Sequence, residues 1–103
     1  MKKKKKIEIK QKIAVLMSIY KQTKIKELIK AIKEIENQID ISCDLLLNID
    51  GELRVEIIKF IKTYIPKGSI KKLKVSESSI NMGLAASMNR LLLNNFAFYD
   101  FFL

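Results

Sequence analysis

The sequence lacks histidine altogether and has only one cysteine and three glycines among its 103 residues. Without histidine, neither a serine–histidine or cysteine–histidine catalytic pair nor a histidine-ligated zinc site can form. The single cysteine, Cys43, excludes an internal disulfide, and its place in an apolar run predicts a buried thiol. Three isolated glycines, Gly51, Gly68 and Gly83, cannot build a GxGxxG fingerprint or a phosphate-binding P-loop.

Long apolar runs are also missing. The run that starts at Ile13 ends far short of the roughly 20 residues that cross a bilayer, and the apolar end of the chain is interrupted by Asp100. Glu8 and Lys10 break the pattern that a signal peptide needs after a basic start. Together with the lone cysteine, these absences predict a cytoplasmic protein.

The positive charge is concentrated at one end. The net charge is +9, and the unbroken run from Lys2 to Lys6 supplies five of those charges. Such a block is most often a solvated tail, although it also suits the inner face of a membrane, at about 1 kcal/mol per residue near anionic lipid. No specific nucleic-acid partner is predicted, because the aromatic residues are not interleaved with the lysines. We expect a basic lead-in over residues 1–12 and one domain over residues 13–103.

Hydrophobic periodicity divides that domain into alternating strands and helices. Continuous apolar runs predict strands over 13–20 and 41–49, a partly alternating run predicts an edge strand over 70–75, and an aromatic run predicts a last strand over 96–103. A polar loop is expected over 76–79. The alternation predicts an α/β fold, a three-layer architecture with a mostly parallel sheet.

Three helices separate these strands. The first is expected to begin at a Thr23 cap and to end near Asn37, and the second to be stopped by the turn from Pro66 to Gly68. The third opens at Asn81-Met82-Gly83. The apolar residues predicted to face the sheet from the first two helices are Ile25, Leu28, Ile29, Ile32, Ile35 and Ile39, then Leu53, Ile57, Ile58, Ile61 and Tyr64.

Polar residues stand where the parallel strands end. Ser18 and Tyr20 close the first strand, Asp50 closes the second, and the segment 81–89 follows the third. The carboxyl ends of parallel strands meet at one edge, so these residues are expected to lie together. The tyrosine ring suits stacking on a nucleobase, the carboxylate suits an imide N–H, and the third helix offers backbone N–H groups to phosphate.

Three segments in this order resemble the family 2 glycosyltransferases. They are Val15-Leu16-Met17-Ser18-Ile19-Tyr20, Leu47-Asn48-Ile49-Asp50-Gly51 and Asn81-Met82-Gly83-Leu84-Ala85-Ala86-Ser87-Met88-Asn89. Their order and spacing are similar to the amino-terminal half of that family's GT-A domain, a Rossmann-like fold, and the resemblance runs from about residue 13 to the end of the chain.

The resemblance implies a nucleotide-diphospho-sugar donor of the UDP or dTDP type and transfer of its sugar to a glycan or a lipid-linked acceptor. It implies that Ser18 and Tyr20 line the base and ribose pocket and that Asp50 contacts the base. The residues implied to shape the loop and helix beside the diphospho-sugar are Asn81, Gly83 and Asn89. The alternatives are a helix cap for Asn81 and close helix–sheet packing for Gly83.

Several residues depart from the family pattern. A complete member is expected to bind Mg²⁺ or Mn²⁺ through a DxD motif, but no Asp-x-Asp occurs here, and Leu103 stands where that motif would begin. We therefore expect a catalytically incomplete, truncated amino-terminal part, with the missing carboxyl-terminal half as a partner and no catalytic or metal-binding residue of its own. Glu77 stands where many relatives have a basic residue, and Asn48 is polar within an apolar strand.

Two other interpretations remain open. In the first, the chain is a small basic module that binds nucleic acid or an anionic surface. In the second, it is an inactive relic. The relic interpretation predicts exposed aromatic side chains at Phe96, Phe98, Phe101 and Phe102.

Overall fold

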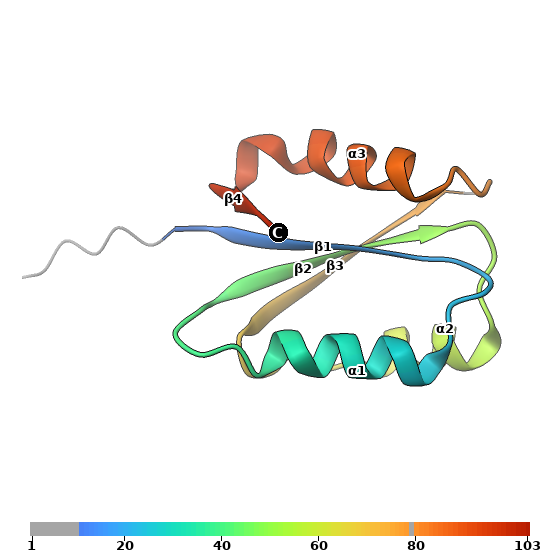
Figure 1. Ribbon diagram of the computed structural model, residues 1–103, viewed down its shortest axis with the longest axis horizontal. Helices are drawn as coiled ribbons and strands as arrows, with labels where there is room; N and C mark the ends of the chain where they lie inside the picture. Colours follow the sequence, from blue (N-terminus) through green and yellow to red (C-terminus); the bar gives the residue numbers. More distant parts are fainter. Residues whose placement is uncertain (1–10, 79) are drawn as a thin grey trace, which may run out of the picture.

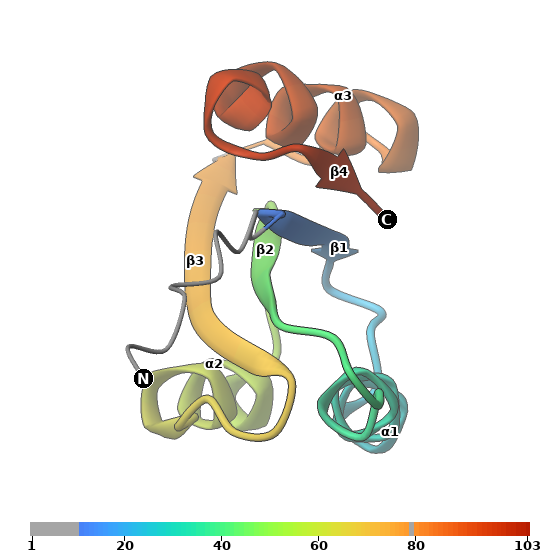
Figure 2. The same ribbon diagram turned by 90° about the vertical axis from the view of Figure 1, so that its left-hand side faces the viewer.

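A computed structural model describes residues 11–78 and 80–103, which form a four-stranded parallel sheet between two layers of helix (Figure 1). The strands are β1 (Ile13–Ile19), β2 (Cys43–Asp50), β3 (Ile70–Ser78) and β4 (Phe101–Phe102). Helices α1 (Ile25–Glu36) and α2 (Val55–Thr63) cover one face, and α3 (Leu84–Asn95) covers the other, as Figure 2 shows. The predicted three-layer α/β architecture with a parallel sheet is confirmed. The lysines from Lys2 to Lys6 lie outside the described residues.

The strand order is β3-β2-β1-β4. The chain moves outward from β1 to β2 and β3, and α3 then returns it across the sheet to pair β4 with the other side of β1. The strand order therefore reverses between β1 and β4. None of the helices in the described part of the chain is long and apolar enough to cross a membrane.

The larger core lies between the sheet and the α1–α2 layer. Strands β1 and β2 are continuous apolar runs because side chains on both of their faces are covered. The buried residues of this core are Ile19, Leu28, Ile32, Cys43, Leu45, Leu47, Ile57 and Ile70. The core under α3 is smaller, with Ala14, Leu46 and Leu91 buried. The burial predicted for Cys43 is confirmed at 3% exposure.

The start of α1 differs from the prediction, whereas its end agrees with it. Lys24 is the residue before its first turn, and Thr23 does not cap the helix, because the Thr23 Oγ1 accepts the Tyr20 backbone N–H at 3.0 Å instead. Ile39 is 85% exposed and lies beyond the helix. The helix ends at Glu36, with Asn37 as its C-cap, and the Ser69 N–H donates to the Glu36 carbonyl at 3.0 Å. Ile58 of α2, predicted to face the sheet, is 37% exposed.

The two later strands also have different bounds. The loop predicted over 76–79 is wrong for its first three residues, because β3 continues to Ser78, whose carbonyl accepts the Gly51 N–H at 2.9 Å. The last predicted strand is wrong in its first half, since Phe96–Phe98 form a 3-10 turn, η1. Only Phe101 and Phe102 pair with β1. The aromatic exposure expected at this end is found at Phe96, Phe98 and Phe101, whereas Phe102 packs against the small core.

Candidate functional site

The candidate site lies at the edge of the sheet where β1, β2 and β3 end. Ser18 and Asn48 are paired in register across β1 and β2, and Asp50 is paired with Ser78 across β2 and β3. Ligands of open parallel sheets bind outside the carboxyl ends of the strands, at the point where the strand order reverses. In this fold that point is beside the end of β1, which Tyr20 directly follows with 42% of its surface exposed.

The Asp50 carboxylate joins the end of β2 to the loop before α3. Its Oδ1 accepts the Met82 backbone N–H at 2.5 Å and the Ser78 hydroxyl at 3.2 Å, and its Oδ2 accepts the Gly83 N–H at 2.9 Å. Asp50 is only 3% exposed. Because α3 has no side-chain cap of its own, this carboxylate occupies the position of one and complements the positive end of the helix dipole.

These contacts favour the charged form of Asp50. The Met82 N–H is the main reason that the pKa of this carboxyl lies below its ordinary value, and the Gly83 N–H and the Ser78 hydroxyl act in the same direction. Burial acts in the opposite direction but is outweighed. Asp50 is therefore an ionised group with both oxygens in use, which makes it a residue that positions the loop.

Glycines permit this close approach of loop and strand. Gly51 has a φ of 82°, and a Cβ there would lie 3.3 Å from the Asn81 backbone nitrogen. Gly83 has a φ of 85°, and a Cβ there would meet nothing within 4 Å. Gly83 is therefore required by its backbone conformation, and the close packing considered for it is not found. Asn81 lies beside it, and its Oδ1 accepts the Gly83 N–H at 3.0 Å.

A row of polar side chains crosses the sheet next to Asp50. Ser18, Asn48 and Ser76 are neighbours on three adjacent strands, and the Ser76 hydroxyl donates to the Asn48 Oδ1 at 3.0 Å. Asn48 and Ser87 are both fully buried. Asn48 Nδ2 and Ser87 Oγ have no hydrogen-bond partner among the described residues. This row explains the polar Asn48 that the apolar strand pattern left unaccounted for.

Sequence reasoning did not include Ser76, Ser78 or Ser87 in the site. A signal for the first two was present, because Ser76 and Ser78 alternate in the same two-residue step as Asn48 and Asp50 on the neighbouring strand. Ser87 gave no such signal, since a serine within a helix carries no mark of the face that it occupies.

Five of the six predicted site residues lie at the carboxyl edge of the sheet, and the sixth, Asn89, does not. Asp50, Asn81 and Gly83 are brought into direct contact, and Ser18 lies beside them in the polar row. Tyr20 stands at the same edge. Asn89 is exposed on α3, two positions after the buried Ser87, so the helix turns it away from the sheet.

Two of the hollows among the described residues lie at opposite edges of the sheet. One, of about 690 Å³, lies at the carboxyl edge on the α2 side and is lined by Ile49, Gly51, Glu52, Leu53, Ile58, Ile61, Lys62, Val75 and Glu77. Most of its lining residues are apolar, and the charged ones are Glu52, Glu77 and Lys62. This composition suits an uncharged ring or a sugar hydroxyl better than a phosphate.

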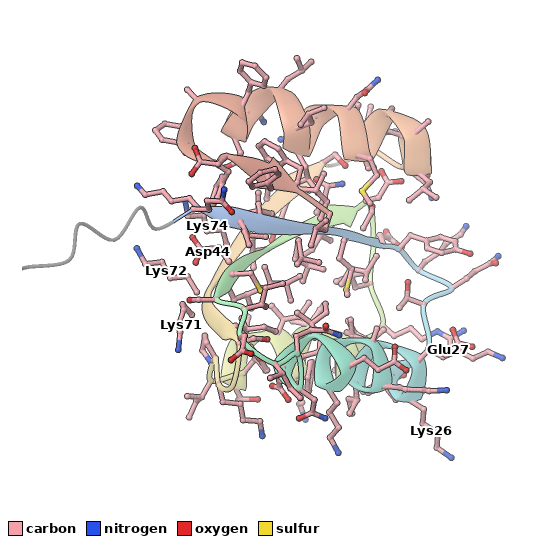
Figure 3. The ribbon with its side chains drawn as sticks, turned by 60° about the vertical axis from the view of Figure 1, so that its left-hand side comes forward. Lys26, Glu27, Asp44, Lys71, Lys72 and Lys74 are labelled. Carbon is pink, nitrogen blue, oxygen red and sulfur yellow. The ribbon has the colours of Figure 1, made fainter. Side chains whose placement is uncertain are left out.

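The other hollow, of about 580 Å³, lies at the opposite, amino-terminal edge. Figure 3 shows Asp44, Lys72 and Lys74 near one another there, and all three line it. The Tyr99 hydroxyl donates to the Asp44 Oδ2 at 2.6 Å, and the Lys74 Nζ lies 5.0 Å from the centre of the Tyr99 ring. Burial, followed by the hydrogen bond to Asp44, raises the pKa of Tyr99 above its ordinary value.

The described residues do not provide a set of donor atoms that could hold a divalent metal. No three Asp, Glu or Cys side chains within residues 11–78 and 80–103 gather closely enough to hold one. The best-placed carboxylate, Asp50, already accepts hydrogen bonds on both oxygens. The Mg²⁺ or Mn²⁺ expected for a complete glycosyltransferase therefore has no ligand set here.

Comparisons with known proteins identify no relative: no family model, no curated protein and no solved structure matches this chain.

Proposed function

We propose that the chain binds a nucleotide-diphospho-sugar of the UDP or dTDP type at the carboxyl edge of its sheet, as the donor-binding part of a family 2-like glycosyltransferase. The principal support is the reversal of strand order beside β1, where Ser18 and Tyr20 stand. The exposed Tyr20 ring offers a stacking surface for a base, and the Ser18 hydroxyl offers a donor and an acceptor.

The loop held by Asp50 supplies the second element of the proposal. Asp50 fixes Met82 and Gly83, and so fixes the amino-terminal end of α3 beside the same edge. The first-turn N–H groups of a helix have no intrahelical partner and suit a diphosphate, and the first turn of α3 carries no acidic side chain. Asp50 then acts on the donor through this loop, which also carries the exposed Asn81 side chain.

The proposal is limited to donor binding. A complete member of the resembled family would use Mg²⁺ or Mn²⁺ to neutralise the diphosphate, but the described residues provide no set of ligands for it. No transfer step is therefore assigned to this chain.

Calorimetric titration of the chain with UDP, UDP-glucose and dTDP, with and without MnCl₂, tests the proposal. We expect binding of at least one of them. Tyr20→Ala should weaken it by about fivefold or more, because stacking of a base on an aromatic ring is worth about 1–3 kcal/mol. Tyr20→Phe keeps the ring and should bind like the original chain.

Two results would contradict the assignment. One is the absence of binding for all three ligands. The other is binding that Tyr20→Ala leaves intact and Lys72→Ala abolishes, since Lys72 lines the hollow at the opposite edge of the sheet. Either result would remove the carboxyl edge as the donor site.

A further inference from the structure

The hollow at the amino-terminal edge of the sheet takes no part in the proposed donor site. Its volume of about 580 Å³ is of the size that holds a small organic ligand. It is lined by residues at or near the starts of β1, β2 and β3, whereas Tyr20 and Asp50 stand at their ends. We call it the amino-edge hollow, and an inference about it does not rest on nucleotide-sugar binding.

Positive charge predominates in the lining of the amino-edge hollow. Among the described residues, three exposed lysines line it, Lys12, Lys72 and Lys74, together with one carboxylate, that of Asp44. One oxygen of this carboxylate is already engaged, because the Tyr99 hydroxyl donates to the Asp44 Oδ2 at 2.6 Å. A concave surface with an excess of one sign of charge attracts ligands of the opposite sign.

Two of the lysines are brought together by β3. Lys72 and Lys74 are two positions apart on this strand, so their side chains point to the same face, and Lys72 is paired in register with Asp44 of β2. The Lys74 Nζ lies 5.0 Å from the centre of the Tyr99 ring and 5.9 Å from that of Phe98. An ammonium group over an aromatic ring is stabilised there and still has N–H groups to donate to an anion.

The third lysine is carried by a fixed piece of backbone. The Lys12 N–H donates to the Asp100 Oδ2 at 2.8 Å, and the Asp100 N–H donates to the Lys12 carbonyl at 2.7 Å. This contact joins the residue before β1 to the residue before β4. The Asp100 carboxylate thus accepts a backbone hydrogen bond, and the Lys12 ammonium group is not needed to satisfy that oxygen.

An aromatic side chain stands beside the lysines. Phe98 lines the amino-edge hollow with 60% of its surface exposed, and Ile13 also lines it. A ligand ring stacked on Phe98 would remove apolar surface of both rings from water. Phe96, in the same 3-10 turn, is 72% exposed but is not part of the lining. The hollow therefore combines ammonium groups with one available aromatic face.

We propose that the amino-edge hollow binds a small aromatic anion of the aryl phosphate class. The ammonium groups of Lys72 and Lys74 hold the phosphate, Lys12 adds a third positive charge, and the ligand ring stacks on Phe98. A phosphate suits these groups better than a carboxylate does, because a phosphate monoester carries a charge of about −1.5 to −2 near neutral pH and offers three acceptor oxygens.

Nuclear magnetic resonance titration of the full chain with 1-naphthyl phosphate tests the proposal. The backbone amide signals of Asp44, Lys72 and Lys74 should move to a plateau as this probe is added. Inorganic phosphate lacks the ring and 1-naphthol lacks the charge, so each should bind about fivefold or more weakly. Equal binding of inorganic phosphate, no saturable shift, or saturable shifts confined to Tyr20 and Gly83 at the opposite edge would overturn the proposal.

Paired lysine variants separate this hollow from attraction by overall charge. Lys72→Ala/Lys74→Ala should weaken binding of 1-naphthyl phosphate by about tenfold or more, because charge-assisted hydrogen bonds are lost. Lys26→Ala/Lys30→Ala removes the same number of positive charges from exposed positions of α1 and should leave binding nearly unchanged. An equal loss in the two double variants would show that the probe responds only to net charge, which contradicts the proposal.

The role of the ring is tested at Phe98. Phe98→Ala should weaken binding of 1-naphthyl phosphate by about threefold or more and leave binding of inorganic phosphate unchanged. Phe96→Ala, at the exposed position outside the lining, is the matched control. Equal effects of the two variants, or an equal loss of both ligands in Phe98→Ala, would exclude stacking on Phe98.

Discussion

At the scale of single residues, Asp50 has the most consequential environment in the molecule. It follows an apolar strand and precedes a glycine, which is also the pattern of an ordinary turn. The fold instead buries its carboxylate beneath the loop before α3 and uses both oxygens as acceptors. Its removal should therefore affect the helix as well as the turn.

We predict that Asp50→Asn lowers the thermal midpoint by about 5–10 °C, the size expected when a domain of this length loses charge-assisted hydrogen bonds. The NH₂ group of the asparagine is a donor, and it would face the N–H of either Met82 or Gly83, which is also a donor. Circular dichroism during heating measures the change. Asp40→Asn is the control, because Asp40 is exposed and its positive φ of 58° is one that asparagine adopts readily.

The same substitution should change the dependence of stability on pH. The pKa of Asp50 is lower in the folded chain than its ordinary value of 3.8, so its contribution is fully present above that value and is lost as the pH falls through the folded pKa. Acid unfolding of Asp50→Asn should therefore be less steep below about pH 4. An unchanged acid profile would indicate that the Met82 and Gly83 contacts do not stabilise the fold.

At the scale of elements, the carboxyl end of α1 is fastened to the turn before β3. The Tyr64 hydroxyl donates to the Glu36 Oε2 at 2.7 Å, and the Ser69 N–H donates to the Glu36 carbonyl at 3.0 Å. Gly68 has a φ of 61°, and a Cβ there would collide with that same carbonyl. These contacts connect α1, the end of α2 and the start of β3 at one point.

Tyr64→Phe should destabilise the chain by about 1–3 kcal/mol, because Glu36, which is 7% exposed, loses a hydrogen-bond donor. Burial, and then Glu36, raises the pKa of Tyr64 above its ordinary value of 10.0. The contribution of Tyr64 is thus present below that value and is lost as the pH rises above it, since the unfolded tyrosine ionises first.

Urea unfolding at pH 7 and at several values above pH 10 measures both effects. The alkaline loss of stability should be smaller in Tyr64→Phe than in the original chain. Tyr20→Phe, a change on an exposed ring that is not joined to Glu36, serves as the control. Equal alkaline slopes in all three proteins would refute a role for the Tyr64–Glu36 contact.

At the scale of the whole molecule, the two helical layers bury unequal amounts of apolar surface against the sheet. Buried apolar residues on the α1–α2 side form a large cluster, whereas the apolar cluster under α3 has three buried members among the described residues, Ala14, Leu46 and Leu91. The start of α3 is held by the Asp50 carboxylate through the Met82 and Gly83 N–H groups. The free energy needed to open a layer follows the apolar area that it buries, so α3 should open before α1 does.

Native-state hydrogen exchange should therefore show weaker protection in α3 than in α1. Leu91→Ala should increase exchange in α3 by about 30-fold or more, because truncating a buried leucine costs about 2–5 kcal/mol, and should change α1 much less. Leu93→Ala, at a position 76% exposed on the same helix, is the control. Equal acceleration in both helices would mean that the layers open as one unit.

The sequence predicted the architecture because hydrophobic periodicity is a local property. The apolar runs of β1 and β2 and the stripe through Leu28 and Ile32 each identify an element without knowledge of its neighbours. The Thr23 cap failed for a local reason, because its hydroxyl accepts the N–H of nearby Tyr20. The boundary that failed at Ser76–Ser78 lies where partners distant in the chain, Asn48 and Gly51, set the local structure. Such partners leave no mark in a local pattern.

The sequence by itself therefore determined the class of fold, the buried strands and the concentration of polar residues at the strand ends. Only the tertiary structure decided that the Asp50 oxygens are taken by Met82 and Gly83, that Asn48 belongs to a polar row, and that β3 is left open. The physical reason is that hydrogen bonds and strand order join residues far apart in the chain, and these depend on how the layers pack rather than on the period of any one segment.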